Sequence, residues 1–291
     1  MLQGSIVALI TPFKNGEIDY TALEKLLHFH LENGTDGFVL LGTTGEATSL
    51  ASDEKDTLLR FAMQRINHKV PVVIGTGSNN LQHTIAMTKR AKELGGDYAL
   101  IVTPYYVKPT QQGLYEFFKA VATKVDIPII LYNVPGRTGV NMTAATTVRL
   151  AKDCPNIVGI KEASGNVVQG SEIVRDAPED FFVLSGDDAT NMPLMAVGAK
   201  GTISVTANII PKLMHEHIKT CLKGDFAEAK KQHLALTNLN QVMFVESNPI
   251  PVKEAAYFMG LIELEYRLPM CPMQECNREL LYKALKEYKL L

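Results

Sequence analysis

A lysine at position 161 follows the apolar run 157–160 and precedes the polar, glycine-containing stretch 162–165. Lysine is ordinarily a surface residue with its ammonium in water. At the end of a buried strand, desolvation disfavours the ammonium and makes the neutral amine accessible. A neutral amine attacks carbonyl groups to form Schiff bases. The alternative is a lysine paired with Glu162, although adjacent residues of a strand face opposite ways.

Other groups that could take part in such chemistry follow apolar runs elsewhere in the chain. Tyr132 could carry a proton to and from a carbinolamine, or it could be a core aromatic residue. Thr43 and Thr44 lie in a glycine-flanked turn whose hydroxyls and backbone N–H groups suit a carboxylate. Arg137 lies in a loop with proline and glycine and could bind a carboxylate through two hydrogen bonds, or it could be a surface arginine.

The elements that must position these residues alternate along the first two thirds of the chain. Continuous apolar runs, typical of strands buried on both faces, occupy 5–10, 37–41, 70–74, 98–102, 127–132, 156–160, 181–184 and 202–205. Helical periodicity separates most of them, at 19–34 with Asp19 as N-cap and at 52–66, 81–96 and 111–125. Eight strands alternating with helices predict an α/β fold, a (β/α)8 TIM barrel, over a doubly wound sheet. Active sites of this fold form at the C-terminal ends of the strands, where Lys161 and Tyr132 lie.

The strand pattern stops after the eighth run. Residues 208–291 read as helix, interrupted by Gly224 and by proline-containing stretches at 248–251 and 268–272. This segment holds more helices than one barrel needs. We therefore expect a catalytic barrel over 1–224 and a C-terminal helical unit over 225–291.

Composition excludes several classes of function. The 291 residues carry a net charge of −2, which gives no reason to expect nucleic acid or an anionic membrane as partner. No apolar run approaches the ~20 residues of a membrane span, and the N-terminus lacks the pattern of a secretory leader. The four cysteines, Cys154, Cys221, Cys271 and Cys276, complete no zinc pattern. We expect a cytoplasmic protein with reduced thiols and no metal, and no role is assigned to Cys271 or Cys276.

Seven motifs occur in a characteristic order along the whole chain. They are GTTGE (42–46), TPYY (103–106), YNVPGRTG (132–139), GIKEASG (159–165), SGDD (185–188), GTISVTAN (201–208) and NPIPVK (248–253). As a set they resemble the dihydrodipicolinate synthase (4-hydroxy-tetrahydrodipicolinate synthase) family. That family consists of pyruvate-dependent, class I aldolase-type barrels, which are typically homotetramers built as dimers of dimers.

The resemblance implies a role for each candidate residue. Lys161 would form the Schiff base with pyruvate, whose carboxylate Thr43 and Thr44 would hold. Thr44, Tyr132 and Tyr106 would form a proton relay, with Tyr106 reaching into the site of a neighbouring subunit. Arg137 would bind the carboxylate of L-aspartate 4-semialdehyde. The backbone carbonyl groups of two further residues, Gly186 and Ile203, would line the pocket.

The activity that the resemblance implies is condensation of pyruvate with L-aspartate 4-semialdehyde in lysine and diaminopimelate biosynthesis. No cofactor is expected, because the lysine itself is the electron sink. A related alternative is another pyruvate-linked lyase, such as N-acetylneuraminate lyase or a keto-deoxy-sugar aldolase. A different class would be a barrel that binds a keto acid without catalysis, but such a protein would not need Lys161 together with Tyr132, Thr44 and Tyr106.

The resemblance also concerns regulation, because many relatives are inhibited by lysine bound in a cleft at a subunit interface. The matching positions here are Ala47, Thr48, Ser52, Lys55, Asn79, His83 and Tyr105. Lys55 places a positive charge where a cationic ligand would bind, and His83 replaces a carboxylate. Since like charge disfavours binding, we predict weak or absent inhibition by lysine.

Overall fold

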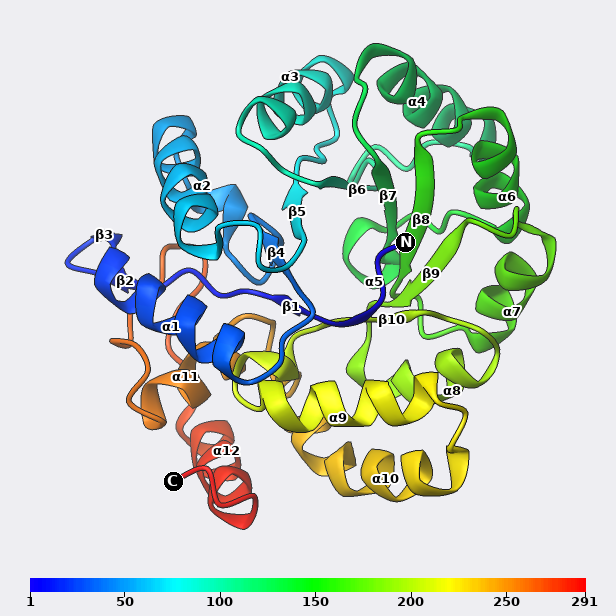
Figure 1. Cartoon of the computed structure of the whole chain (residues 1–291). Coiled ribbons are helices and arrows are strands. Elements are labelled where there is room, and N and C mark those ends of the chain that lie inside the picture. The colour runs from blue at the N-terminus through cyan, green and yellow to red at the C-terminus, as the bar shows by residue number, and fades with distance from the viewer.

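The computed structural model describes residues 1–291 and is built around a closed barrel of eight parallel strands (Figure 1). The strands are β1 (Gly4–Ala8), β4 (Gly37–Leu40), β5 (Val72–Gly75), β6 (Tyr98–Val102), β7 (Ile129–Asn133), β8 (Ile157–Glu162), β9 (Phe182–Ser185) and β10 (Gly201–Ser204). Each of the eight apolar runs supplies one strand, and β10 pairs with β1 to close the ring. The predicted (β/α)8 barrel is confirmed, and closure excludes the doubly wound sheet.

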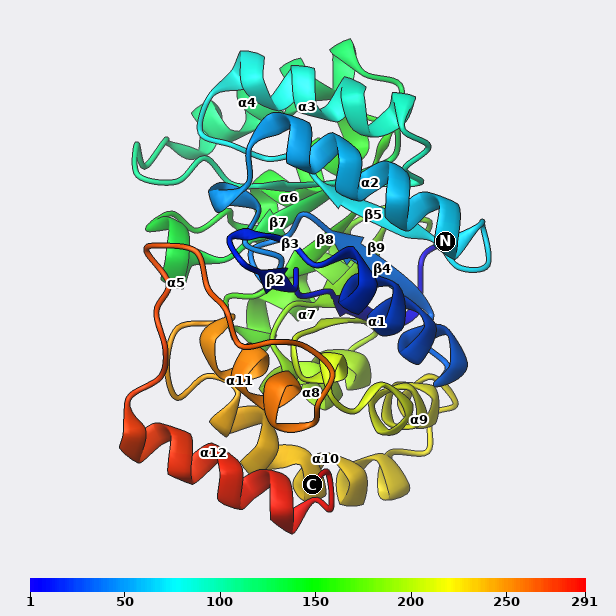
Figure 2. The ribbon, with the colours of Figure 1, turned by 90° about the vertical axis from the view of Figure 1, so that its left-hand side faces the viewer.

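Helices cover the outside of the barrel between successive strands (Figure 1). They are α1 (Tyr20–Glu32), α2 (Ser52–Ile66), α3 (Leu81–Glu93), α4 (Gln111–Lys124), α6 (Ala144–Asp153), α7 (Val167–Asp176), α8 (Asn191–Ala196) and α9 (Pro211–Leu222). The short α5 (Pro135–Thr138) directly follows β7 and lies at one end of the barrel rather than on its outside (Figures 1 and 2). The predicted cap of α1 is confirmed, because the Asp19 carboxylate accepts a hydrogen bond from the backbone N–H of Ala22 at 2.9 Å.

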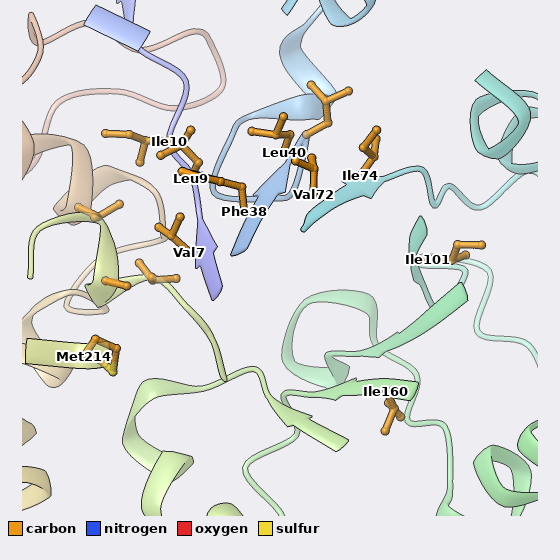
Figure 3. Packing of buried hydrophobic residues seen from close by; sticks show 14 of the residues in the cluster. Val7, Leu9, Ile10, Phe38, Leu40, Val72, Ile74, Ile101, Ile160 and Met214 are labelled. Carbon is orange, nitrogen blue, oxygen red and sulfur yellow. The ribbon is translucent and has the colours of Figure 1, made fainter. Parts of the chain in front are cut away.

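Strand residues divide between two hydrophobic clusters according to the face on which they lie. Ile6 and Ala8 belong to a cluster of 12 buried residues inside the barrel, together with Tyr132 and Ile203. Val7 belongs to the larger cluster of 65 buried residues, which lies between strands and helices (Figure 3). Burial of both faces explains why the strands read as continuous apolar runs rather than as alternating ones.

One small element departs from the sequence expectation near the N-terminus. Strands β2 (Phe13–Lys14) and β3 (Glu17–Ile18) form a hairpin between β1 and α1 that the sequence analysis did not predict. Each strand has only two residues, so neither carries a periodic signal that could be read from sequence.

The C-terminal segment contains α10 (Phe226–Val242), α11 (Ile250–Phe258) and α12 (Glu275–Glu287). The expectation of helix over nearly all of 208–291 is wrong for residues 259–274, which form no helix. Prolines at 269 and 272 cannot donate helical hydrogen bonds. This stretch instead contacts the β2–β3 turn, where the Arg267 guanidinium donates to the backbone carbonyl of Gly16 at 2.7 Å.

The C-terminal helices lie together on one side of the barrel (Figure 2). Helix α10 packs against α9 and α8, and α12 packs against α11 and α10. The larger hydrophobic cluster includes residues of α10, α11 and α12 as well as residues of the barrel, so apolar packing continues across residue 225. The division into units at that residue stays a prediction. None of the helices has the length and hydropathy needed to cross a bilayer.

Candidate active site

A cavity of 440 Å³ opens at the C-terminal ends of the barrel strands. Six of the residues singled out from the sequence line it: Thr43, Thr44, Tyr132, Arg137, Lys161 and Gly186. They follow or end strands β4, β7, β8 and β9, so residues far apart in sequence converge at one end of the barrel. This volume suits small organic molecules.

Lys161 is the penultimate residue of strand β8, and its side chain lies at the cavity inside the barrel. The residue is 6% exposed, and its side chain forms no ion pair or hydrogen bond with the rest of the chain, although its backbone pairs with β7 and β9. Strand register places it beside Tyr132 of β7, and its Nζ lies 4.2 Å from the centroid of the Tyr132 ring. A buried amine without an acidic partner next to a phenol is suited to attack a carbonyl group.

Glu162 points to the opposite side of the strand, as the alternation of strand residues predicted. Its carboxylate is buried and accepts hydrogen bonds from the Asn133 amide at 3.1 and 3.2 Å and from the Gln169 amide at 2.9 Å. A third donor is the backbone N–H of Ser164, at 2.7 Å. Glu162 therefore holds β7, β8 and α7 together and does not neutralise Lys161.

The turn after β4 presents two unpaired backbone donors at the cavity. The N–H groups of Gly45 and Glu46 donate to the carbonyls of Gly42 and Thr43 at 3.1 and 3.0 Å. The N–H groups of Thr43 and Thr44 donate to no protein acceptor, although Thr44 is only 3% exposed. A buried N–H group without a partner is rare, and the free N–H of buried Thr44, next to that of exposed Thr43, is suited to an anion.

Asn248 joins two of the predicted site residues, and the sequence analysis assigned it no role. Its side-chain amide donates to the Thr44 hydroxyl at 2.9 Å, and its backbone carbonyl accepts from the Arg137 guanidinium at 3.1 Å. The residue is buried, lines the cavity and directly precedes Pro249, the residue before α11. Its motif, NPIPVK, was visible in the sequence, but no local pattern indicates a contact over about two hundred residues.

Residues from the C-terminal helices also complete the wall of the cavity. Asn240, Gln241 and Phe244, in or after α10, line it opposite the strand ends. Asp187 lines it as well, and burial raises the pKa of its carboxyl group, with a further contribution from neighbouring Asp188. These residues were not predicted as site residues.

The structure does not bring every predicted residue to the cavity of this chain. Tyr106 is 86% exposed and lies in a loop with a positive φ of 73°. Its backbone N–H donates to the carbonyl of Thr138 at 3.3 Å, while the residue itself does not line the cavity. Ile203 is 1% exposed inside the barrel and is also absent from the cavity wall.

A second cleft, of 400 Å³, contains most of the residues at the positions that match the lysine-binding cleft of relatives. Ala47, Thr48, Lys55, Asn79, His83 and Tyr105 line it, whereas Ser52 does not. No aspartate or glutamate is among its lining residues, and burial lowers the pKa of Lys55. A third cavity, of 270 Å³, shares Thr43 and Tyr132 with the active-site cavity and Thr48 and Tyr105 with this cleft.

Metal-binding groups do not gather anywhere in the chain, since no three histidine, cysteine or acidic side chains are arranged to hold an ion. The four cysteines are free thiols, of which Cys154 and Cys221 are buried and Cys271 and Cys276 are exposed.

A (β/α)8 barrel with a buried lysine, its side chain unpaired, near the C-terminal end of its sixth barrel strand defines a class of enzyme, the Schiff-base-forming lyases of the class I aldolase type. The comparisons with known proteins agree. The model of the dihydrodipicolinate synthetase family matches residues 1–288. The chain belongs to this family.

Individual relatives cover the chain from end to end. A 4-hydroxy-tetrahydrodipicolinate synthase of Sulfurihydrogenibium sp. (strain YO3AOP1) is 51% identical over 292 residues, with 100% of both chains covered. The crystal structure of dihydrodipicolinate synthase from Aquifex aeolicus superposes with a TM-score of 0.97 at 50% identity, covering 99% of this chain and 98% of that one. The chloride-inhibited dihydrodipicolinate synthase from Acinetobacter baumannii, complexed with pyruvate, gives a TM-score of 0.98 at 48% identity, with 100% of both chains covered.

Proposed function

We propose that this protein condenses pyruvate with L-aspartate 4-semialdehyde through a Schiff base on Lys161 and yields 4-hydroxy-tetrahydrodipicolinate, a step of lysine and diaminopimelate biosynthesis. The observation that carries the proposal is the unpaired, buried amine of Lys161, 4.2 Å from the ring centroid of Tyr132. The names of the relatives support the choice of substrates.

The first step places pyruvate in the cavity. Its carboxylate accepts hydrogen bonds from the free N–H groups of Thr43 and Thr44, which brings the keto carbon toward Lys161. The amine attacks that carbon, and loss of water from the carbinolamine leaves the Schiff base. Tyr132 lies beside the amine and carries protons during the exchange.

Carbon–carbon bond formation follows. The iminium form of Lys161 accepts the electron pair released when a proton leaves the pyruvate methyl group, and this gives an enamine. The enamine carbon attacks the aldehyde of the second substrate, whose amine then attacks the imine carbon and displaces Lys161. The lysine serves as the electron sink, so these steps draw on no organic cofactor.

Two further residues complete the proposal. Arg137 is exposed beside the cavity, where its guanidinium can bind the carboxylate of aspartate semialdehyde. Tyr106 is exposed and outside its own subunit's cavity, so we propose that it enters the site of a second copy and completes a relay with Thr44 and Tyr132. A homotetramer built as a dimer of dimers would provide that contact.

The alternatives within this class are N-acetylneuraminate lyase and the keto-deoxy-sugar aldolases. They are not favoured, because the relatives at about half identity over the whole chain are synthases. The test is direct. Purified protein should form the cyclic product from pyruvate and aspartate semialdehyde and should not release pyruvate from N-acetylneuraminate. Pyruvate release without cyclic product would overturn the proposal.

A further inference from the structure

The C-terminal segment holds the Thr43–Thr44 turn through a buried ion pair. Lys253 of α11 donates from Nζ to the Oε1 of Glu46 at 2.6 Å, and the two side chains are 0% and 2% exposed. The Lys253 Nζ also lies 4.3 Å from the centroid of the Phe13 ring. Burial lowers the pKa of Lys253, whereas attraction and hydrogen bonding by Glu46 oppose that change. Each of these two buried charges is stabilised by the other, so the loss of one leaves an unpaired charge in the protein interior.

Glu46 adopts a backbone conformation that residues other than glycine rarely occupy. Its φ is 52° and its ψ is 34°, in the left-handed region. Such a conformation persists only where surrounding contacts hold it. The contacts to the Glu46 side chain are the ion pair with Lys253 and a hydrogen bond from the backbone N–H of Arg267 at 3.4 Å, and both come from the C-terminal segment.

The orientation of Glu46 determines where the free donors of the turn point. Its N–H donates to the carbonyl oxygen of Thr43, which belongs to the same planar peptide unit as the unpaired N–H of Thr44. In a trans peptide the carbonyl and the N–H point in opposite directions. Fixing the Thr43 carbonyl therefore fixes the Thr44 N–H toward the cavity.

We infer that Glu46 and Lys253 are positioning residues that aim the N–H of Thr44, one of the turn's two free N–H groups, at a substrate carboxylate and thereby couple helix α11 to substrate affinity. The inference rests on the proposed function, in which those N–H groups bind pyruvate. Neither residue lines the active-site cavity, so any effect of these residues on pyruvate is indirect.

The adjacent residue of α11 provides a matched control. Glu254 is 0% exposed and is paired with Arg278 of α12, away from the turn. Replacing Arg278 by methionine also removes one partner of a buried carboxylate, but it leaves the Glu46–Lys253 pair in place. A purely structural role for Lys253 would make the two variants behave alike.

The experiment compares the full-length wild-type protein with Lys253→Met, Arg278→Met and the double variant Glu46→Gln/Lys253→Met. The single variants should melt at lower temperature. The double variant should recover thermal stability, because it buries neutral groups of similar shape in place of an unpaired charge. The KM for pyruvate should rise by about tenfold or more in both Lys253 variants and stay within about twofold of wild type in Arg278→Met.

Each outcome separates the possibilities. A double variant with wild-type stability and wild-type KM for pyruvate would show that the pair only balances buried charge. An equal rise of KM in Arg278→Met would likewise contradict the inference. If Lys253→Met does not fold, the KM of the double variant for pyruvate tests the inference. The wild-type protein is also treated with pyruvate and borohydride. A missing adduct there would refute the proposed function itself, whereas an adduct with unaltered KM in the double variant would refute only the positioning role.

Discussion

Gly186 leaves the space that the side chain of Lys161 occupies. A Cβ atom at position 186 would lie 2.9 Å from both Cγ and Cε of Lys161 and 2.7 Å from the Cβ of Ala163. The backbone N–H of Gly186 donates to the carbonyl of Glu162 at 2.8 Å, so the glycine cannot move away without breaking a contact to β8. The absence of a side chain at position 186 thus leaves room for the conformation in which the proposed nucleophile lies.

Gly186→Ala should therefore impair Schiff-base formation. Overpacking forces side chains away from their preferred rotamers at a cost of ~1–3 kcal/mol, which corresponds to about 5- to 150-fold in kcat/KM for pyruvate. The control is Gly113→Ala in α4, where the new Cβ would make only ordinary contacts at 3.4 Å or more. Steady-state kinetics of both variants test this, and wild-type kinetics for Gly186→Ala would contradict it.

Tyr106→Phe should keep pyruvate affinity and lose rate, because it removes only the hydroxyl of the proposed relay. General acid–base catalysis contributes about 10²–10⁴-fold, which sets the expected loss of kcat. The measurement is kcat together with KM for pyruvate. A variant with kcat within about twofold of wild type would remove Tyr106 from the mechanism.

The exposure of Tyr106 leads to a second prediction, which concerns assemblies that contain two different variant subunits. Inactive Tyr106→Phe and inactive Lys161→Ala subunits should regain part of the activity when mixed, because a hybrid can form one site with both residues intact. Activity is measured after dissociation and reassembly of the mixture. Mixtures that stay inactive would indicate that Tyr106 serves only its own subunit.

Arg137→Ala should raise the KM for aspartate semialdehyde by about ten- to hundredfold, because hydrogen bonds to a charged group contribute ~1.5–3 kcal/mol. The KM for pyruvate should change much less. Since Arg137 also donates to the carbonyl of Asn248, Arg137→Lys tests whether charge alone suffices. Equal changes of KM for both substrates would assign Arg137 a structural role in the loop.

Lysine should inhibit this protein weakly or not at all. The cleft that contains Lys55 and His83 has no acidic residue to pair with an α-ammonium group, and Lys55 adds a like charge. Titration of lysine under saturating substrates should give an IC50 above about 1 mM, a binding energy weaker than about −4 kcal/mol. An IC50 clearly below that value would show that the cleft still binds lysine.

The barrel could be predicted from the sequence because its signals are local. Burial on both faces makes each strand a continuous apolar run, and α2 begins and ends where periodicity and first-turn acids predicted. The family motifs then identified Lys161, Tyr132 and the turn at Thr43–Thr44, which the structure brings to one cavity. The predicted family and fold are confirmed by the comparisons and by strand closure.

Contacts between distant segments could not be predicted in the same way. The Asn248–Thr44 hydrogen bond and the Glu46–Lys253 ion pair each join residues more than two hundred positions apart. A single sequence holds no local pattern for such pairs. The roles assigned to individual site residues, and the contribution of Tyr106 from a second subunit, stay predictions that the variants above test.

The most direct measurement is borohydride reduction in the presence of pyruvate, followed by intact mass and peptide mapping. Wild-type protein should gain one reduced pyruvate adduct per chain, about 72 Da for the added propionate unit, located on Lys161. Lys161→Ala should gain none and should lose several orders of magnitude in kcat while keeping its fold, since only one side chain beside a cavity is removed. A wild-type protein without an adduct, or with the adduct on another lysine, would contradict the account.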